Sequence, residues 1–417
     1  MPPALDEAQL RAVRIVAQRF GGGAKAQART KTPDSLGYVR TLGGADAYLA
    51  ARARIPGLTR GNLEALVAEE ALRVVPAVRG CIYLVPAADA ALCLRTAHAQ
   101  SATRDARDAE RAGIRKGELD NVAAAVLESL RSSGPETTDG LRRRLPDGTL
   151  RSLGERGKKA GVSSALPPAL RQLEFAGKIA RLPVEGRLDH EKYVWRPTTT
   201  DPFAAADLPC DNDQLHGRLL TRFLGFAGAS DLGAFCAWSG LTQRDAKAAL
   251  PHAEFVPVNA KNLGAGAMAS AEIETLLRRA ERAADAIAFL PFEDNLVHLT
   301  GGLSPFVVEE MHNLSVPTWG KGKTMQPLGS TRHAMFRSIL ADGRIRGFWE
   351  YDPDASDLVT HLFDPPAKPV RTAIEAAATE TATFLREQIG HGRSFSLDSD
   401  DELRRRVAQL RKMTRAR

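Results

Sequence analysis

The chain has 417 residues, with 57 lysines and arginines against 50 aspartates and glutamates, which gives a formal net charge of +7. Its apolar content of 43% and charged content of 26% are ordinary for globular proteins, so the composition excludes a fibrous chain and one that is disordered throughout. No apolar run approaches the ~18–20 residues of a membrane span, and the acidic start MPPALDEAQL differs from a secretory signal. We expect a soluble, cytoplasmic protein whose basic balance permits, without proving, binding to a polyanion.

The first segment, residues 1–110, is predicted to form an N-terminal winged-helix-like module. The pattern from Leu5 to Pro86 is mostly helical and ends in an apolar strand, Val78–Val85. A winged helix combines three helices with a two-stranded wing, and this copy is less regular than those that follow.

Residues 111–200 show the clearest winged-helix pattern. One helical face carries Leu119, Val122, Ala123, Val126, Leu127 and Leu130. A second short helix is predicted from Thr138 to Leu145, then a basic loop and a third helix from Ser163 to about Gly177. Two strands follow, Lys178–Pro183 and Lys192–Trp195, with Glu185-Gly186-Arg187 near their connection. Three helices and a wing therefore predict a central winged helix.

Residues 201–285 are predicted to form a third winged helix. Leu215, Leu219 and Phe223 lie on one helical face, and Thr242 is placed to cap a later helix that runs to Leu250. A strand begins at Phe255.

The C-terminal part has a different pattern. Residues 286–390 are predicted to form a β-rich, barrel-like scaffold with a terminal helix from about Ala367 to Ile389. Its strands are Ala286–Leu290, Met335–Ala341, Arg344–Tyr351 and Ser356–Phe363, and Asp342-Gly343 is a strong hairpin turn. Residues 391–417 are predicted to be a basic tail that ends in a capped, solvated helix. The expected fold class is α+β, with tandem winged-helix modules around the scaffold.

Several phrases in this order resemble the AlkZ-like family of bacterial crosslink-repair DNA glycosylases and their winged-helix relatives. They are Leu36-Gly37 leading to AYLAARARIPGLTR at 47–60, RGCIYLVP at 79–86, DLGAFCAWSGL at 231–241, LPFEDNL at 290–296 and FRSILADGRIRGFW at 336–349. The similarity covers roughly residues 5 to 363. It implies tandem winged helices around a β-rich scaffold that together enclose duplex DNA. In the enzymes of the family, a base that bears an alkyl lesion is hydrolysed from its sugar.

The chain departs from this family at the catalytic position. The enzymes carry a Gln-x-Gln or Gln-x-Asp pair just after the Leu-Gly, and the matching residues here are Arg40-Thr41-Leu42. Leucine can neither hold a water nor accept a proton, and a lone guanidinium repels a developing sugar cation. The family phrase Arg-Gly-Thr-x-His is also altered, to Arg79-Gly80-Cys81-Ile82-Tyr83. Both changes weaken the prediction of an active enzyme.

Candidate catalytic positions are Arg40, Leu42, Tyr83 and Asp294, and all but Leu42 have a structural alternative. Arg40 is expected either to bind a phosphate or to pair with a nearby acid such as Asp46. Tyr83 is expected to stack on a base or to lie in the core. Asp294 stands where the family places an acid that faces DNA, and its alternative role is to cap a helix.

Candidate DNA contacts are mostly basic residues of the central module. The helix N-terminus at Ser163-Ser164 offers free backbone N–H groups to a phosphate. Basic side chains can add contacts that release counterions, and Arg187 stands at the predicted wing tip. The full set is Arg79, Arg151, Arg156, Lys158, Lys159, Ser163, Ser164, Arg171, Arg187, Lys321, Lys323 and Arg337. The alternative is a solvated basic face on a module used for protein packing.

Other chemistries find little support in the sequence. Lys321-Gly322-Lys323-Thr324 lacks the first glycine of a phosphate loop, because Pro317 stands in its place. The nine histidines and the four cysteines (Cys81, Cys93, Cys210 and Cys236) show no metal-ligand spacing and no disulfide framework. We expect no metal and no cofactor.

The leading hypothesis is a monomeric protein that binds double-stranded DNA, alkylated or crosslinked, at the bacterial nucleoid, and that has lost or rebuilt the catalytic pair. The runner-up is an active monofunctional glycosylase that uses other polar residues, with Asp46 and Asp294 nearest. A third hypothesis is a transcriptional regulator. Such winged-helix regulators usually dimerise on half-sites, and the sequence shows no obvious dimerisation segment.

Overall fold

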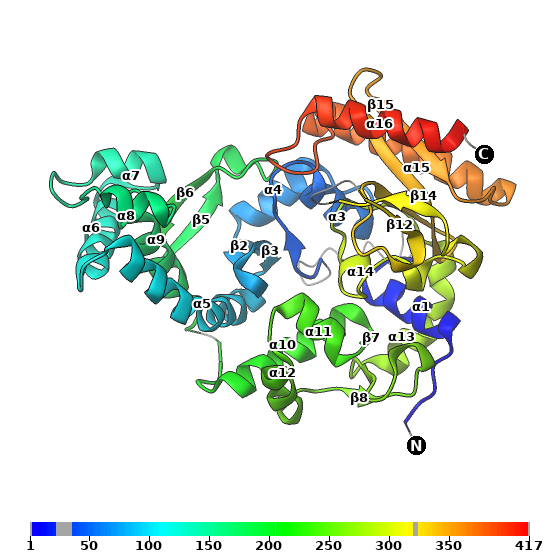
Figure 1. Cartoon of the computed structure of the whole chain (residues 1–417), viewed down its shortest axis with the longest axis horizontal. Coiled ribbons are helices and arrows are strands. Elements are labelled where there is room, and N and C mark those ends of the chain that lie inside the picture. Colours follow the sequence, from blue (N-terminus) through cyan, green and yellow to red (C-terminus); the bar gives the residue numbers. More distant parts are fainter. Residues whose placement is uncertain (1, 22–35, 205, 320–323, 416–417) are drawn as a thin grey trace.

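Small antiparallel sheets, each accompanied by helices, follow one another along the chain and surround the strands of the N-terminal part (Figure 1). The structure is a computed structural model that describes residues 2–21, 36–204, 206–319 and 324–415. The mixed α/β class is confirmed. Within the described residues, no helix is long and apolar enough to cross a bilayer.

The N-terminal part is built around a three-stranded sheet of order β1-β3-β2. Its elements are α1 (Glu7–Ala17), β1 (Val39–Arg40), α3 (Asp46–Arg54), α4 (Arg60–Ala68), β2 (Leu72–Pro76), β3 (Ile82–Pro86) and α5 (Ala90–Ala112). The predicted single strand Val78–Val85 is wrong in its first half, because Arg79 and Gly80 both have positive φ and turn the chain between β2 and β3. In this sheet Arg40 lies opposite Tyr83.

The central part contains three helices and a hairpin close to the predicted positions. They are α6 (Glu118–Ser133), β4 (Glu136–Thr137), α7 (Thr138–Arg144), α9 (Leu166–Phe175), β5 (Ile179–Pro183) and β6 (Tyr193–Pro197). The predicted basic loop contains a further short helix, α8 (Gly154–Lys159). Helix α9 begins at Leu166 rather than at Ser163, with a proline in its first turn, where the missing N–H costs nothing.

The third part repeats the pattern of helices and a small sheet. It comprises α10 (Asn212–Ala227), β7 (Ala229–Ser230), α11 (Leu232–Ser239), α12 (Gln243–Ala249), β8 (Val256–Pro257) and β9 (Met268–Ala269). The predicted cap is confirmed, since the Thr242 hydroxyl accepts a hydrogen bond from the Asp245 N–H at 3.2 Å. The apolar face of α1 joins a core that this part shares with the C-terminal part. In that core α1 packs on α13 (Ile273–Arg279).

The C-terminal sheet is open, so the expectation of a barrel-like scaffold is wrong. Strands β10 (Ile287–Phe289), β13 (Arg337–Ala341), β14 (Arg344–Asp352) and β15 (Asp357–Leu362) form a four-stranded antiparallel sheet in that order, and its two edge strands do not pair with each other. The nearby elements are α14 (Asn295–His298), β11 (Ser315–Pro317) and β12 (Met325–Pro327). Helices α15 (Lys368–Phe384) and α16 (Asp400–Arg415) cover the sheet instead of closing it (Figure 1).

The C-terminal tail is not a solvated helix. Helix α16 has a polar face and a buried apolar row, Leu403, Val407 and Leu410. It packs along β14 and β15, because a sheet without a covering helix leaves one apolar face in water. The tail is therefore part of the fold.

We predict that Gly343→Val destabilises the protein by about 1–3 kcal/mol. Asp342 and Gly343 have φ of +50° and +66°, which confirms the predicted hairpin turn, and a β-branched residue tolerates such φ poorly. An added Cβ meets its nearest atom only at 3.6 Å, so the cost comes from the backbone conformation rather than from a clash. Denaturant melts measure the effect. Gly61→Ala, on the exposed side of α4, is the control and should not destabilise; equal stability of wild type and Gly343→Val would contradict the assignment of the turn.

Candidate functional site

The residues that match the family's catalytic pair line a small cavity at the end of β1. The cavity has a volume of about 10 Å³, which is close to the space that one water molecule needs. Its walls come from two segments distant in sequence: Val39, Arg40, Leu42, Asp46 and Ala50 in the first, and Pro291, Glu293 and Asn295 in the second. The cavity is therefore the part of the structure that corresponds to the resemblance's catalytic pair.

Arg40 forms an ion pair with Glu293. A second nitrogen of the guanidinium lies 3.7 Å from the Cys81 sulfur. Burial acts to lower the pKa of Arg40, but Glu293, Cys81 and Tyr83 together outweigh it, and the pKa is raised overall. The expected partner, Asp46, was wrong, since the acid that reaches Arg40 is 253 residues away in sequence. This pairing balances the positive charge that had argued against catalysis.

Asp46 is the first residue of α3 and lies on the same cavity. One carboxylate oxygen accepts a hydrogen bond from the Phe292 N–H at 2.9 Å, and the other lies 3.1 Å from Arg337 Nη2. Burial raises the pKa of Asp46 to about 6, although Arg337 opposes the shift. A carboxylate with this pKa is mostly ionised at neutral pH and can accept a proton there.

Asp294 does not face an open surface. Its side chain is 1% exposed, and both oxygens bind Arg54, each at 2.9 Å. One of those oxygens also accepts the Leu296 N–H at 2.8 Å, which caps α14. The expectation of an acid facing DNA is therefore wrong at this position, and the capping alternative is confirmed.

Tyr83 lies in the core of the N-terminal part, as its structural alternative predicted. The residue is 2% exposed, and burial raises the pKa of its phenol. Stacking on a base needs an exposed ring face, which this position does not offer. Tyr83 instead supports the strand opposite Arg40.

Beside the cavity, two histidines and several arginines form a cluster that the sequence did not reveal. Arg79 has φ of +58° and its Nη2 lies 2.9 Å from His298 Nε2. Burial, and then the charge of Arg79, lowers the pKa of His298 to about 4. The pKa of His333 is also lowered, by burial first and by the nearby Arg332 among other charges. Both imidazoles are therefore neutral at pH 7, and the excess charge of the cluster is positive.

Two of the predicted DNA contacts instead hold the C-terminal end of α5, and a third pairs with an acid farther back on the same helix. Arg156 donates to the backbone oxygens of Glu110 at 2.8 Å and Arg111 at 3.2 Å. Arg151 donates to the Gly113 carbonyl and pairs with Glu118 at 2.8 Å, and Arg171 pairs with Asp105 at 3.1 Å. The carbonyls at a helix C-terminus have no partner within the helix, which is why they attract these cations.

Arg187 and Arg337 are also structural. Arg187 pairs with Asp189 and donates to the Ile389 carbonyl at 3.1 Å, so the expected wing tip packs against the C-terminal part. Arg337 is fully buried and stacks on Trp349, with 4.9 Å between the guanidinium carbon and the ring centroid. Neither guanidinium is free for DNA.

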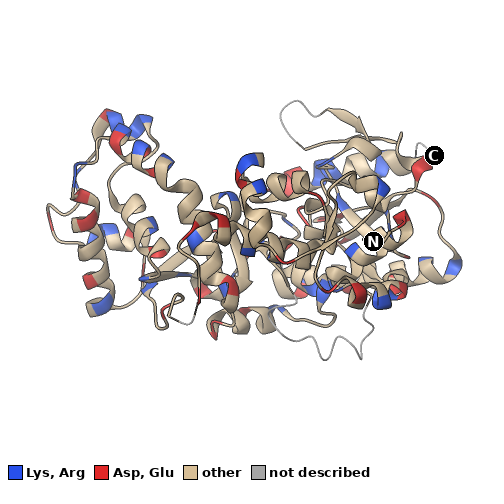
Figure 2. Cartoon of the chain, turned by 90° about the horizontal axis from the view of Figure 1, so that it is seen from below, with Lys and Arg blue, Asp and Glu red and all other residues tan. Residues whose placement is uncertain are grey.

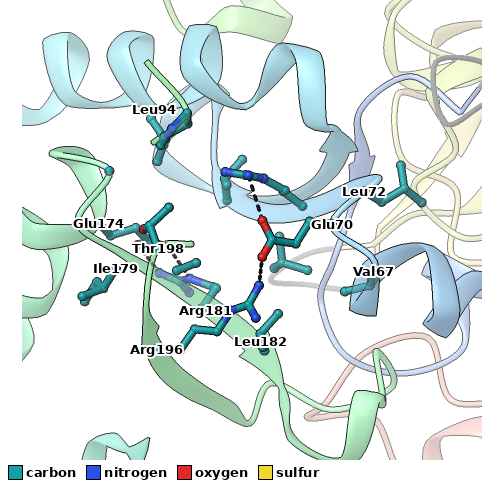
Figure 3. Close-up of a pocket in the computed structure, with 16 residues that line it drawn as sticks. Val67, Glu70, Leu72, Leu94, Glu174, Ile179, Arg181, Leu182, Arg196 and Thr198 are labelled. Carbon is teal, nitrogen blue, oxygen red and sulfur yellow. Dashed lines mark hydrogen bonds and ion pairs between the residues drawn. The ribbon is translucent and has the colours of Figure 1, made fainter. Parts of the chain in front are cut away.

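The central part is fixed to the N-terminal part by a further set of charges (Figure 3). Glu70 pairs with Arg73 at 2.8 Å and with Arg196 across the contact. Beside them, Arg181 binds Glu174 through two hydrogen bonds of 2.6 Å each. Acidic and basic residues are interspersed over much of the chain, in keeping with such internal pairing (Figure 2).

The remaining predicted contacts are accessible or lie outside the described residues. Lys158, Lys159 and Ser163 are exposed before α9, whereas Ser164 is buried. Lys158 pairs only with the equally exposed Glu155, at 2.7 Å. Lys321 and Lys323 lie outside the described residues. Among the described residues, no group of three or more histidine, cysteine or acidic side chains is placed to hold a metal ion.

Sequence reasoning missed Glu293, His298 and His333. Glu293 stands in the LPFEDNL phrase, directly before Asp294, which the sequence made the candidate catalytic acid. The available signal was that aspartate is favoured as the capping residue before a helix. That preference assigned Asp294 to the cap of α14 and left Glu293 as the acid with another role.

We predict that Asp294→Asn destabilises the protein by about 3–5 kcal/mol, because it leaves the Arg54 charge buried without its counterion. Chemical denaturation measures the change. The matched control is Asp354→Asn, which breaks an exposed pair with Arg404 and should cost under ~1 kcal/mol. Similar losses in the two variants would show that the buried pair is not a major source of stability.

Comparison with known proteins identifies the family of the chain. The chain matches the model of the family described as DNA glycosylase AlkZ-like over residues 34–384. Among solved structures it is similar to the Streptomyces sahachiroi DNA glycosylase AlkZ, with a TM-score of 0.64 and 17% identity over 94% of this chain and 98% of that one. Nothing among curated proteins matches. Since the family model spans most of the sequence, the chain belongs to the AlkZ-like DNA glycosylase family.

Proposed function

We propose that this protein binds duplex DNA and hydrolyses the N-glycosidic bond of alkylated purines, with Asp46 and Glu293 in place of the family's polar pair. The observation that carries this proposal is the water-sized cavity between Asp46 and the Arg40–Glu293 ion pair, at the position of the catalytic pair. The sequence alone favoured loss of catalysis because it showed only a guanidinium and a leucine there.

The chemistry needs two things at the sugar: a water that loses a proton, and negative charge near the cation that develops. Asp46 supplies a base that is ionised at pH 7. Glu293, whose side chain is 18% exposed, supplies the negative charge. Arg40 holds Glu293 in place but weakens its field, and Leu42 gives no hydrogen bond to the water. We therefore expect release about 10²–10⁴-fold slower than in a relative with two glutamines.

DNA binding is assigned to the three winged helices that we infer from the repeated helix-and-sheet units, with boundaries near residues 110, 200 and 285. Lys158 and Lys159 lie on α8, before α9, the third helix of the central unit, and both side chains are exposed. Arg79 and Arg332 extend the positive charge to the cavity. We infer that one chain acts as a monomer on one DNA site in the bacterial cytoplasm.

A second candidate function is recognition of damaged DNA without base release. It is favoured by Leu42, which cannot orient a water. It is also favoured by the ion pair with Arg40, because that pair already engages the carboxylate of Glu293. The two candidates differ in one measurable property, the appearance of abasic sites.

We predict slow release of 7-methylguanine from a duplex, at a rate that rises with pH through about 6 and then levels, because Asp46 must lose its proton to act as base. The assay treats a singly modified duplex with excess protein and then with alkali, which cuts abasic sites. Asp46→Asn should remove the pH-dependent step, and Glu293→Gln should lower the rate about 10²–10³-fold.

The control is Glu375→Gln, which neutralises an exposed acid of α15 and so makes the same change of charge away from the cavity. An inert wild-type protein that still binds DNA would favour recognition without catalysis. Unchanged rates in both cavity variants would show that the activity resides elsewhere.

We also predict that DNA affinity falls linearly on a log–log salt plot, with a slope of about −0.9 per phosphate contact. Changing Lys158 and Lys159 to Glu should weaken binding to all sequences about equally and reduce the magnitude of the slope by about 2. Lys368→Glu with Lys412→Glu carries the same charge change on α15 and α16 and should have a smaller effect. Affinity independent of salt would contradict binding through phosphates.

A further inference from the structure

Five charged side chains, the buried charge row, lead from the small cavity at the end of β1 to helix α16. In spatial order they are Asp46, Arg337, Glu350, Arg406 and Asp398, and each side chain is at most 8% exposed. Arg337 Nη2 lies 3.1 Å from Asp46 Oδ1, and Arg337 Nη1 lies 4.0 Å from Glu350 Oε2. Arg406 Nε lies 3.2 Å from the same Glu350 oxygen, and Arg406 Nη2 lies 2.7 Å from Asp398 Oδ2. The row therefore connects the cavity with the C-terminal helix.

The acids of the row outnumber its cations by one. Three carboxylates and two guanidiniums leave one excess negative charge when every group is ionised, and excess charge is costly in a buried place. Asp398 keeps its charge, because Arg406 donates two hydrogen bonds to it, of 2.7 and 3.1 Å, and the Ser394 N–H donates a third at 3.0 Å. Asp46 lines the cavity and is the most exposed of the three acids. A proton that relieves the excess charge therefore binds most readily at Asp46.

The Arg337 guanidinium is shared between two of these acids. Its Nη2 meets Asp46 and donates to the Gly392 carbonyl at 2.7 Å, whereas its Nε and Nη1 are buried and have no hydrogen-bond partner among the described residues. Asp46 and Glu350 therefore compete for the charge of one guanidinium. Burial raises the pKa of Asp46 to about 6, Arg337 opposes the rise, and the charge of Glu350 adds to it.

Other charges around Asp46 have partners of their own. On the cavity side, Arg40 pairs with Glu293. On the segment that leads into α16, Arg393 pairs with Asp400 at 3.0 Å. Paired charges of opposite sign largely cancel at a distance, so the buried charge row is the main source of asymmetric charge at Asp46.

Glu350 controls how much of the Arg337 charge reaches Asp46. A carboxylate that meets an undivided guanidinium gives up its proton at low pH and is a weak general base. We infer that Glu350 is a positioning residue for purine release, because it draws Arg337 partly away and so lets Asp46 take a proton from water. This inference rests on the proposed role of Asp46 as the general base.

The test measures the pH at which Asp46 loses its proton. Carbon NMR of the full chain, with isotopically labelled aspartate carboxyl groups, follows the titration, and Asp46→Asn identifies the resonance. Glu350→Gln removes the excess negative charge, so the midpoint should move down by about one pH unit. Arg406→Gln leaves Glu350 to draw on Arg337 alone, so the midpoint should move up. The matched control is Asp352→Asn, which removes an acid of the same strand that pairs with Arg411 of α16 at 2.6 Å and should leave the midpoint unchanged.

Thermal melts show which variants fold, and Arg406→Gln carries the test if Glu350→Gln does not fold. A midpoint that stays in place in the row variants, or that moves as far in Asp352→Asn, overturns the inference. The pH dependence of purine release is measured on the same variants and should move with the carboxyl midpoint. A shifted midpoint without any purine release counts against the proposed function only, and purine release with an unmoved midpoint counts against the role of Glu350 only.

Discussion

The buried ion pair between Arg54 and Asp294 is the interaction on which the rest of the structure depends. Besides Asp294, the guanidinium binds the Gln18 side chain at 2.7 Å, and Gln18 in turn donates to the Phe226 carbonyl at 2.5 Å. Segments near residues 18, 54, 226 and 294 therefore meet at one point. Because an uncompensated buried charge is very unfavourable, these segments are stable only when all are assembled. The same assembly brings Glu293, the neighbour of Asp294, to the end of β1.

Arginine is used here largely as an internal connector. Arg337 stands in the core, Arg187 joins the central wing to the C-terminal part, and Arg156 holds the end of α5. The planar guanidinium can bind several carbonyl or carboxylate oxygens at once, which suits such contacts. A net charge of +7 therefore overstates the positive charge that the surface of the molecule leaves without an internal partner.

The small cavity at the end of β1 brings charges of both signs together. Arg40 introduces a charge that alone opposes a sugar cation, and Glu293 balances it within the same cavity. The nearby Asp46 is kept partly protonated below neutral pH by burial. Within this cavity the charges of Arg40 and Glu293 therefore compensate each other, whereas Asp46 is balanced by Arg337.

The sequence by itself determined the local features of this protein. The hairpin at Asp342-Gly343 and the cap at Thr242 were predictable, because backbone φ and capping depend on a few adjacent residues. The family phrases also indicated the AlkZ-like family, which the family model confirms. Only the tertiary structure decided that Arg40 pairs with Glu293 and that Arg337 is buried. A charged side chain looks the same in sequence whether it meets water, DNA or a distant acid, and the choice is made by which segments pack together.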